Sequence, residues 1–344
     1  MGQDPEPRYR VLGEKGLIAL GGVFTGDASG ELFAAYNASG AGSELILDFS
    51  GIEHIDVSGI NELIKLIVRA GVRGRSVTAV GLNRDIKDIF KVTRIDEAIR
   101  NRSSSAVEPV SVYDRKKIAA WARPVEKITV SEVPEGAISL NVDGLKLMGP
   151  LQGFGRFWEK TYHVRLAGVN PPPAVAIAVF KEHFSCFQPP QNNYFTARTG
   201  IKPGEVVLIN AHTAAGFVCT GLWVIYADDE SFALMTPQGH PESGWVSFSA
   251  FKEHGSTVVK ITSFARASDP LYEIWSWLTD YHESERVLTQ VLESLAGHFG
   301  APGWINILRS CIDPRIQLGR VANIRYNARI RTMLSLQKGH AYTS

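Results

Sequence analysis

The sequence of 344 residues has little of what marks several protein classes. It holds only three cysteines, Cys186, Cys219 and Cys311, which lie far apart with none in a C-x-x-C pair. Neither a disulfide framework nor a zinc site is therefore expected. No stretch reaches the roughly 18 consecutive apolar residues of a membrane helix, and the start, MGQDPEPRYR, lacks the apolar core of a signal peptide. We expect a cytoplasmic protein.

The chain also lacks an excess of charge, because its formal net charge is +1. This argues against nucleic-acid binding as a general property. The exception is the last segment, where arginines accumulate against a single acid, Asp313, and alternate with Leu318, Val321, Ile324 and Ile330 at near-helical spacing. Such a pattern is typical of a solvated helix face. Docking to an acidic partner or an anionic membrane surface is the alternative, although we do not expect membrane contact.

The length predicts two domains, since a domain takes roughly 100 to 200 residues. The best linker candidate is NRSSSAVEPVSVYDRKK, residues 101–117, which is polar, rich in serine and weakly periodic. The chain therefore divides into residues 1–100, the linker 101–117, and residues 118–344. Flexible attachment through such a linker would let the two domains move independently.

Strand and helix patterns alternate in the first domain. A strong apolar strand over 45–49 is followed by a helix over 59–70, in which Ile60, Leu63, Ile64 and Ile67 form one apolar stripe. Another strand, SVTAVGL, leads into a helix entered through Asn83, a good N-cap residue. This alternation predicts an α/β fold with helices packed on a mainly parallel or mixed sheet.

An acid, a serine and a glycine stand at the point where the strong strand gives way to the helix. The serine, Ser58, is expected at the positive end of the helix dipole, near free backbone N–H groups, where a phosphate is tolerated. Two interpretations stay open. Ser58 accepts a phosphate that alters whatever docks over the turn, or it only caps the helix, a role worth about 1 kcal/mol. Asn61 stands where a capping box would have glutamate.

The segments LILDFSGIEHIDVSGI and VTAVGLNRDIKDIFKVTRIDEAI resemble the STAS domain, the fold of anti-sigma factor antagonists. In that family the turn typically reads Asp-Ser-Ser-Gly-Leu, and a partner kinase phosphorylates the second serine. The resemblance implies that Ser58 is the phosphoacceptor. It also implies that Ser58, Asp56 and Gly59 dock to a protein partner such as a serine kinase or an anti-sigma factor. Val57 departs from the pattern by replacing the first serine.

The second domain reads as β-rich with a long helical region over 270–299. KITVSEV, AISLNVD and FWEKTYHVRLAG are among the expected strands, and NPPPAVAIAVFKEHFSCF is an expected helix. These patterns predict an α+β domain in which a curved antiparallel sheet wraps a long C-terminal helix. GFGRFWEKTYHVRL, FALMTPQGHPESGWVSFSAF and SFARASDPLYEIWSWL resemble a helix-grip family that is START/Bet v 1-like and DUF1990-like. The resemblance implies an apolar cavity between sheet and helix.

Aromatic residues on the expected strands are candidates for that cavity. A packed core is the alternative for any one of them, whereas as a set they predict a pocket for an apolar or aromatic small molecule. The candidates are Trp223, Tyr226, Phe232, Trp245, Phe248 and Phe251.

Motifs for catalysis are scarce. GHPESG holds a histidine, an acid and a serine too close together to converge as a triad, so it predicts a hairpin turn. His163, His183 and His212 have no metal-ligand spacing. GFGRFW lacks the third glycine of a dinucleotide loop. We therefore expect no cofactor and no metal.

Three functions remain open. The leading one is a non-catalytic regulatory protein of the partner-switching type, in which Ser58 phosphorylation controls docking and the second domain senses a small molecule. The second is a carrier of lipids or other hydrophobic ligands, or an accessory protein of their transport. The third is a cyclase-like enzyme in the helix-grip cavity, with Glu242, His240 and Asp269 as its candidate acids and bases.

Overall fold

The computed structural model describes residues 9–14, 16–102, 118–213, 216–278, 282–301 and 303–337. The chain forms two compact units, Met1–Pro124 and Val125–Ser344. Most of the expected linker lies outside the described residues. Residues 118–124, which the sequence placed in the second domain, belong to the first unit, where the indole N–H of Trp121 donates to the carbonyl of Ile55 at 3.0 Å.

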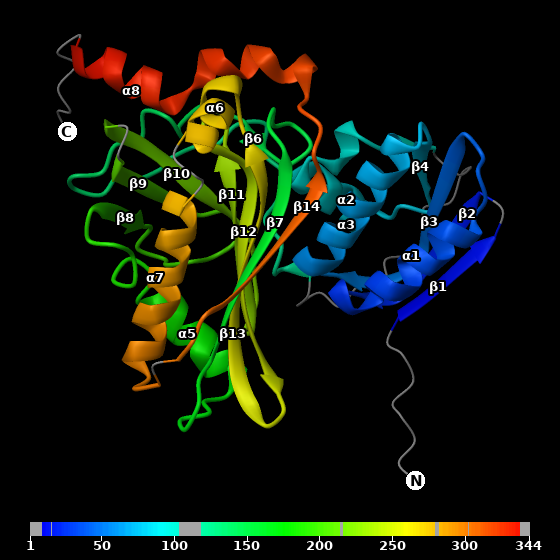
Figure 1. Ribbon diagram of the computed structural model, residues 1–344, viewed down its shortest axis with the longest axis horizontal. Helices are drawn as coiled ribbons and strands as arrows, with labels where there is room; N and C mark the ends of the chain where they lie inside the picture. Colours follow the sequence, from blue (N-terminus) through cyan, green and yellow to red (C-terminus); the bar gives the residue numbers. More distant parts are fainter. Residues whose placement is uncertain are drawn as a thin grey trace. The chain divides into compact units, whose positions relative to one another are not determined.

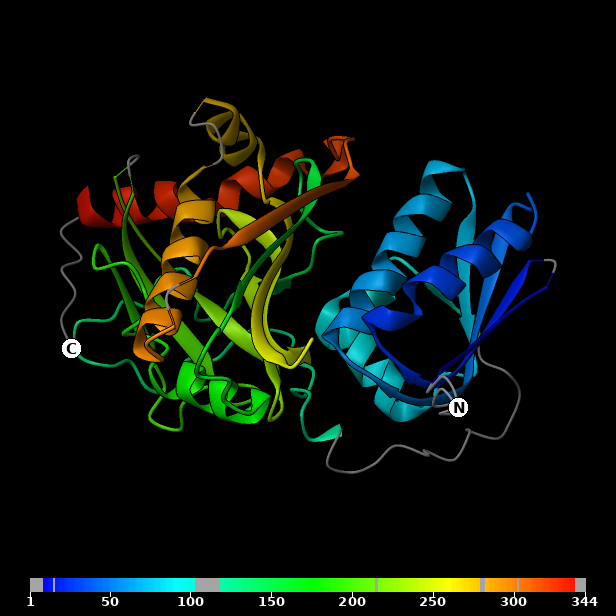
Figure 2. The same cartoon turned by 60° about the horizontal axis from the view of Figure 1, so that its bottom comes forward.

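The first unit contains a five-stranded mixed sheet in the order β1-β2-β3-β4-β5. The first pair is antiparallel and the other neighbours are parallel, which confirms the predicted α/β fold (Figure 2). The strands are β1 (Tyr9–Glu14), β2 (Leu17–Phe24), β3 (Glu44–Ile55), β4 (Ser76–Val80) and β5 (Arg100–Asn101).

Helices α1 (Ser29–Ala38), α2 (Val57–Val72) and α3 (Arg84–Thr93) pack with this sheet. The predicted stripe of α2 is buried, and three of its four members are fully inaccessible to solvent. Helix α3 begins after Asn83, whose side chain accepts the backbone N–H of Ile86 at 2.9 Å, as an N-cap residue does. A short 3₁₀ helix, η1 (Gly26–Ala28), connects β2 to α1.

The second unit is built on a nine-stranded antiparallel sheet. Its strands curve around α5 (Pro173–Glu182) and α7 (His282–His298), which confirms the predicted α+β architecture of a curved sheet and a helix (Figures 1 and 2). Eight strands follow the order β14-β7-β13-β12-β11-β10-β9-β8, and β6 pairs with β11. The strands are β6 (Leu147–Met148), β7 (Phe157–Arg165), β8 (Asn192–Thr196), β9 (Val206–Thr213), β10 (Gly216–Ala227), β11 (Ser231–Pro237), β12 (Glu242–Glu253), β13 (Ser256–Ala267) and β14 (Asn306–Asp313).

The main core of this unit lies between the concave face of the sheet and the two helices. Phe232 and Phe248 face each other across β11 and β12 and stack with centroids 4.5 Å apart. Phe180 of α5 packs edge-on against both rings. Leu292 and Leu295 of α7 complete the core from the other helix, so burial of these side chains holds the sheet in its curve.

Two segments expected as strands, residues 127–133 and 137–143, adopt irregular structure. Ile128 and Val142 are buried, which accounts for the apolar alternation in the sequence. Side chains take part in the hydrogen bonds of these segments. The side-chain amide of Asn141 donates to the carbonyl of Cys219 at 2.8 Å, and the carboxylate of Asp143 accepts the backbone N–H of Val130. The strand prediction for these two segments was therefore wrong, because alternation of apolar and polar residues also occurs in irregular structure that buries single side chains.

The helical region over 270–299 is also divided, into α6 (Pro270–Leu278) and α7, with residues 279–281 outside the described residues. It is not the last element. Strand β14, a 3₁₀ helix η3 (Leu318–Tyr326) and α8 (Ala328–Gln337) follow it, and the near-helical spacing of the basic segment belongs to the last two. The sequence pattern did not predict β14, which adds an edge strand to the sheet beside β7.

An acid on α7 ties this helix to two strands. The carboxylate of Glu285 accepts from Nε and Nη2 of Arg309 on β14, at 2.8 and 2.6 Å, and Nζ of Lys160 on β7 lies 3.1 Å from it. Glu285 is buried, and its bonds with Arg309 lower its pKa to about 2. A paired carboxylate of this kind stabilises the fold at neutral pH.

We predict that Glu285→Gln lowers the free energy of unfolding by about 1–3 kcal/mol at pH 7, because Lys160 loses its buried counter-charge. The lowered pKa means that the contribution is complete above the ordinary value of 4.5 and disappears as the pH falls to about 2. Urea unfolding at several pH values measures this difference.

Glu253→Gln is the matched control. Its ion pair with Arg165 is exposed on both sides, so we expect a loss of about 0.5 kcal/mol or less. Equal losses for the two variants at pH 7 would contradict the role given to Glu285.

Candidate functional site

The first site is the turn between β3 and α2. Asp56 is the N-cap residue of α2, and its Oδ1 accepts the backbone N–H of Gly59 at 2.8 Å. The hydroxyl of Ser58 donates to the same oxygen at 2.7 Å and accepts the N–H of Gly26 at 2.8 Å. The half-buried hydroxyl is therefore held by one acceptor and one donor. The capping role that the sequence left open for Ser58 belongs to Asp56.

Gly59 is buried and supports this turn through its lack of a side chain. A Cβ atom there would lie 2.3 Å from the carbonyl oxygen of Phe24, so only glycine lets α2 approach the end of β2 this closely. Gly26 is also close, with Ser58 Oγ 3.3 Å from the place that its Cβ would take. The predicted site residues Asp56, Ser58 and Gly59 thus form one hydrogen-bonded turn against η1.

The second site is a cavity of about 270 Å³ between the concave face of the second unit's sheet and helices α6 and α7. Apolar side chains, among them Trp245, Trp275 and Leu288, make up most of its wall. The ionisable and hydroxyl side chains that line it are Tyr194, Thr213, Thr236, His240, Glu242, Ser263, Tyr272, Ser276 and Ser284.

His240 and Glu242 reach the cavity from the turn between β11 and β12. Gly239 makes this turn possible with a φ of 90°, and a Cβ there would lie 1.9 Å from the carbonyl oxygen of Tyr326. The backbone N–H of Glu242 donates to Nδ1 of His240 at 3.0 Å, and the carbonyl oxygen of Glu242 lies 3.1 Å from the same nitrogen. The N–H favours the tautomer with the proton on Nε2, whereas the carbonyl oxygen favours the tautomer with the proton on Nδ1.

Burial sets the charge states around this turn. It lowers the pKa of His240 to about 4, so the imidazole is neutral at pH 7. Burial also raises the pKa of Glu242, while the charge of Lys160 and a hydrogen bond with Ser284 act in the opposite direction. Burial, together with the nearby Glu242 carboxylate, raises the pKa of Tyr194 to about 12. Burial is therefore the largest influence on the pKa of His240, Glu242 and Tyr194 alike.

The six aromatic candidates lie in different places. Trp245 lines the cavity, whereas Phe232 and Phe248 stack in the core. Trp223 is buried, Tyr226 is buried and donates to Asp228, and Phe251 packs beneath the ammonium group of Lys260. Strand alternation sends neighbouring side chains to opposite faces, so a set chosen by composition cannot all face one cavity.

Sequence reasoning missed Lys160, Tyr194 and Ser284, because they come from β7, β8 and α7 and no spacing connects them. GHPESG does form the predicted hairpin turn. Its serine, Ser243, points elsewhere and donates to the carbonyl of Gly149 at 2.8 Å. Within the described ranges, no group of three or more His, Cys, Asp or Glu side chains is placed to hold a metal ion. None of the helices there has the length and apolar character to cross a bilayer.

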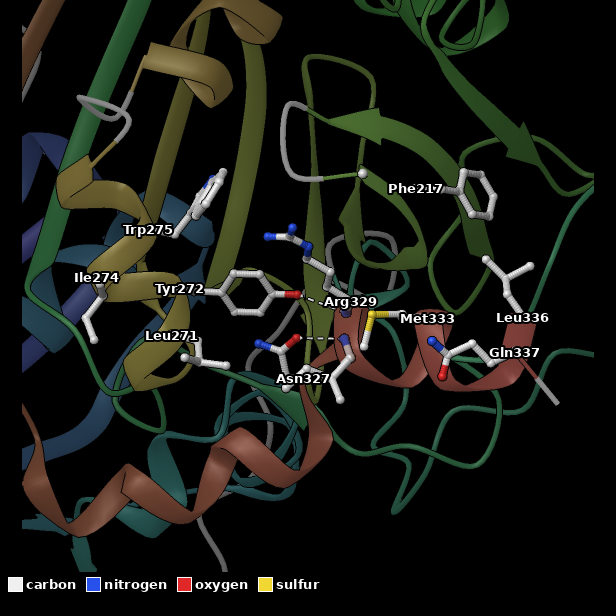
Figure 3. A pocket seen from close by; sticks show the side chains of 12 residues that line it. Phe217, Leu271, Tyr272, Ile274, Trp275, Asn327, Arg329, Met333, Leu336 and Gln337 are labelled. Carbon is white, nitrogen blue, oxygen red and sulfur yellow. Dashed lines mark hydrogen bonds between the residues drawn. The ribbon is translucent and has the colours of Figure 1, made fainter.

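An outer groove of about 610 Å³ lies on the other side of α6, bounded by α8 and the start of β10 (Figure 3). Leu271, Ile274 and Met333 give it an apolar floor. The hydroxyl of Tyr272 accepts the backbone N–H of Arg329 at 3.2 Å and so connects α6 to α8. Tyr272 and Trp275 line both the groove and the inner cavity, so α6 is the wall between them.

Comparison with solved structures found proteins similar to the second unit in fold only. Protein Ms6760 from Mycobacterium smegmatis is 10% identical with a TM-score of 0.31, over 41% of this chain and 89% of that one. TTHA0849 from Thermus thermophilus is 14% identical with a TM-score of 0.33, over 42% and 97%. Zhui aromatase/cyclase from Streptomyces sp. R1128 is 14% identical with a TM-score of 0.32, over 41% and 93%. Such likeness says nothing about ligand or activity.

No protein of curated function matches the chain. A family model described as "Mlab, STAS domain" matches residues 8–101. The match covers all five strands of the first unit and the turn that holds Ser58. The N-terminal part of this chain therefore carries a STAS domain, as its turn and its order of elements predicted.

Proposed function

We propose that the protein is a non-catalytic regulator of the partner-switching type. Its STAS domain docks to a protein partner over the turn at Ser58, and phosphorylation of Ser58 controls the contact. The second unit binds a small, mostly apolar molecule in its cavity. A STAS domain supports a regulatory role in general, and phosphate control and ligand binding are the finer parts of the proposal.

The observation that carries the proposal is the position of the Ser58 hydroxyl between Asp56 and Gly26. A phosphate on Ser58 would remove the proton that Asp56 accepts and would place two anions side by side. The N–H of Gly26 and the N-terminus of α2 would still favour the phosphate. We therefore expect modification to change the shape and charge of the turn while α2 stays folded.

The low pKa of His240 supports a non-catalytic role for this residue. A general base works best with a pKa near the operating pH, whereas burial lowers the pKa of His240 to about 4. The hydroxyl of Ser243, the nearest serine in sequence, is engaged with Gly149. His240 is thus better suited to ligand binding than to general-base catalysis.

We predict that Ser58→Glu abolishes capture of the protein partner. The new carboxylate lies beside Asp56, is repelled by that side chain, and carries part of the charge of a phosphate. Ser58→Ala should retain the partner. Affinity capture from the native cell extract, read by quantitative mass spectrometry, compares these variants with the wild type.

Ser50→Glu, at an exposed position of β3 in the same unit, is the charge-matched control and should capture the partner normally. Recovery of the same partner by wild type and Ser58→Glu would contradict gating by this residue. Circular dichroism spectra of the three variants check that each is folded.

Carriage of a hydrophobic ligand is the second candidate, and the cavity is the observation that favours it. At about 270 Å³ it lies just below the range of about 300–1,000 Å³ that accommodates drug-sized ligands. This size fits one small molecule better than a lipid with two long chains. We therefore place ligand sensing ahead of lipid transport.

We predict that Leu288→Trp, which adds volume at the cavity wall, weakens the binding of naphthalene at least tenfold, because the ring occupies the space of the probe. Isothermal titration calorimetry of the full chain measures the affinity. Leu271→Trp is the matched control, since Leu271 lines only the outer groove and is 42% exposed. A loss confined to Leu271→Trp would show that the probe binds in the outer groove and would contradict the prediction.

A further inference from the structure

We propose that the STAS domain carries a binding site for a small anion with two linked phosphate groups, formed by three arginines around the ring of Tyr36. Arg69 lies in the last turn of α2, Arg73 is the residue that ends this helix, and Arg75 directly precedes β4. The site therefore lies at the opposite end of α2 from Ser58. It is separate from the docking turn and from the cavity of the second unit, so it goes beyond the proposed function.

One aromatic ring gathers the three guanidinium groups. The ring of Tyr36 on α1 is fully buried. The Cζ atoms of Arg69, Arg73 and Arg75 lie 5.8, 5.2 and 5.3 Å from its centroid, a distance at which a cation is attracted to an aromatic ring. Arg69 and Arg73 are four residues apart, so they lie on the same face of α2. Both are exposed, which leaves their N–H donors open to a ligand.

The positive charges of this cluster are not balanced by acids. Within the part of the chain that the structure describes, no carboxylate forms an ion pair with any of the three arginines. The backbone carbonyl of Glu44 accepts from Nη2 of Arg75 at 3.3 Å, but its carboxylate accepts from Thr78 and Arg102 instead. Like charges around one ring repel one another, so an anion that contacts them is attracted by their sum.

Arg75 is the fixed member of the cluster. Its side chain is buried, and its Nη1 donates to the hydroxyl of Ser39 at 3.0 Å. Its Nε is a buried donor that has no partner. Because water screens a buried charge less than an exposed one, Arg75 adds to the attraction for an anion that binds at its two exposed neighbours.

The chemistry of arginine selects the class of anion. A guanidinium group is a planar fork that donates two parallel hydrogen bonds to the oxygens of one phosphate. A single phosphate monoester carries a charge of about −1.5 to −2, which is less than the charge of three arginines. Two linked phosphates supply more negative charge and enough oxygens to meet a separate fork on Arg69 and on Arg73. A diphosphate therefore fits the cluster better than a single phosphate or a carboxylate.

Isothermal titration calorimetry of the full chain with three anions tests the proposal. The anions are inorganic pyrophosphate, inorganic phosphate, and citrate, which carries several charges on carboxylates. The titrations are made at pH 7 in about 20 mM NaCl, because more salt screens exposed charges. We expect pyrophosphate to bind about tenfold more tightly than either of the other two, the ratio that one further charge-assisted hydrogen bond supplies.

Arg69→Gln and Arg73→Gln test the two exposed arginines. Each variant removes one positive charge and one fork, so pyrophosphate should bind about tenfold more weakly. Arg84→Gln is the matched control, since Arg84 is an exposed arginine of the same unit. It follows β4 whereas Arg75 precedes this strand, so the length of the strand separates it from the cluster, and the affinity should be unchanged. Circular dichroism spectra check that all three variants are folded.

Several results would overturn the inference. If the wild type does not bind pyrophosphate, or binds citrate equally well, the cluster is not a diphosphate site. If both Arg69→Gln and Arg73→Gln keep the full affinity, pyrophosphate binds elsewhere. An equal loss in Arg84→Gln would show that the net charge of the domain is responsible and not the cluster. None of these results depends on phosphorylation of Ser58 or on the cavity, so the proposed function is tested separately.

Discussion

One carboxylate oxygen organises the N-terminal site. Oδ1 of Asp56 accepts both the Gly59 N–H, which starts α2, and the Ser58 hydroxyl, which points toward η1. Gly59 then allows the helix to lie against the carbonyl of Phe24, and Gly26 closes the turn from the other side. A change in the charge or the hydrogen bonding of Ser58 therefore acts on the start of a helix and on a loop at once. This is the property that a docking switch requires.

The second unit holds polar side chains at the wall of a mostly apolar cavity. Burial alone would make such groups costly. The turn at Gly239 satisfies Nδ1 of His240 with a backbone N–H, and Glu285 balances Lys160 and Arg309. The same contacts hold α7 against β7 and β14.

The sequence predicted those features that depend on local pattern. The apolar stripe of α2, the Asn83 cap and the order of strands and helices in the first unit all followed from spacing over a few residues. The turn at Ser58 was found because its residues are contiguous. The identity of the cap was not found, since Asp56 and Ser58 are both good capping residues and only the geometry distinguishes them.

Features that depend on distant pairing were missed or misassigned. Residues 127–133 alternate like a strand but bury Ile128 without a partner ladder, while β14 has exposed side chains and pairs with β7 from far along the chain. The polar side chains of the cavity could not be predicted together either, because Tyr194, Glu242 and Ser284 come from β8, the β11–β12 turn and α7.

The most direct test of the account is tandem mass spectrometry of the protein purified from its own cells under several growth conditions, with every phosphate assigned to a residue. The account predicts phosphate on Ser58, at an occupancy that changes between conditions. Complete sequence coverage of the turn with Ser58 unmodified in every condition would contradict it. The hydroxyl between Asp56 and Gly26 would then be a structural contact alone.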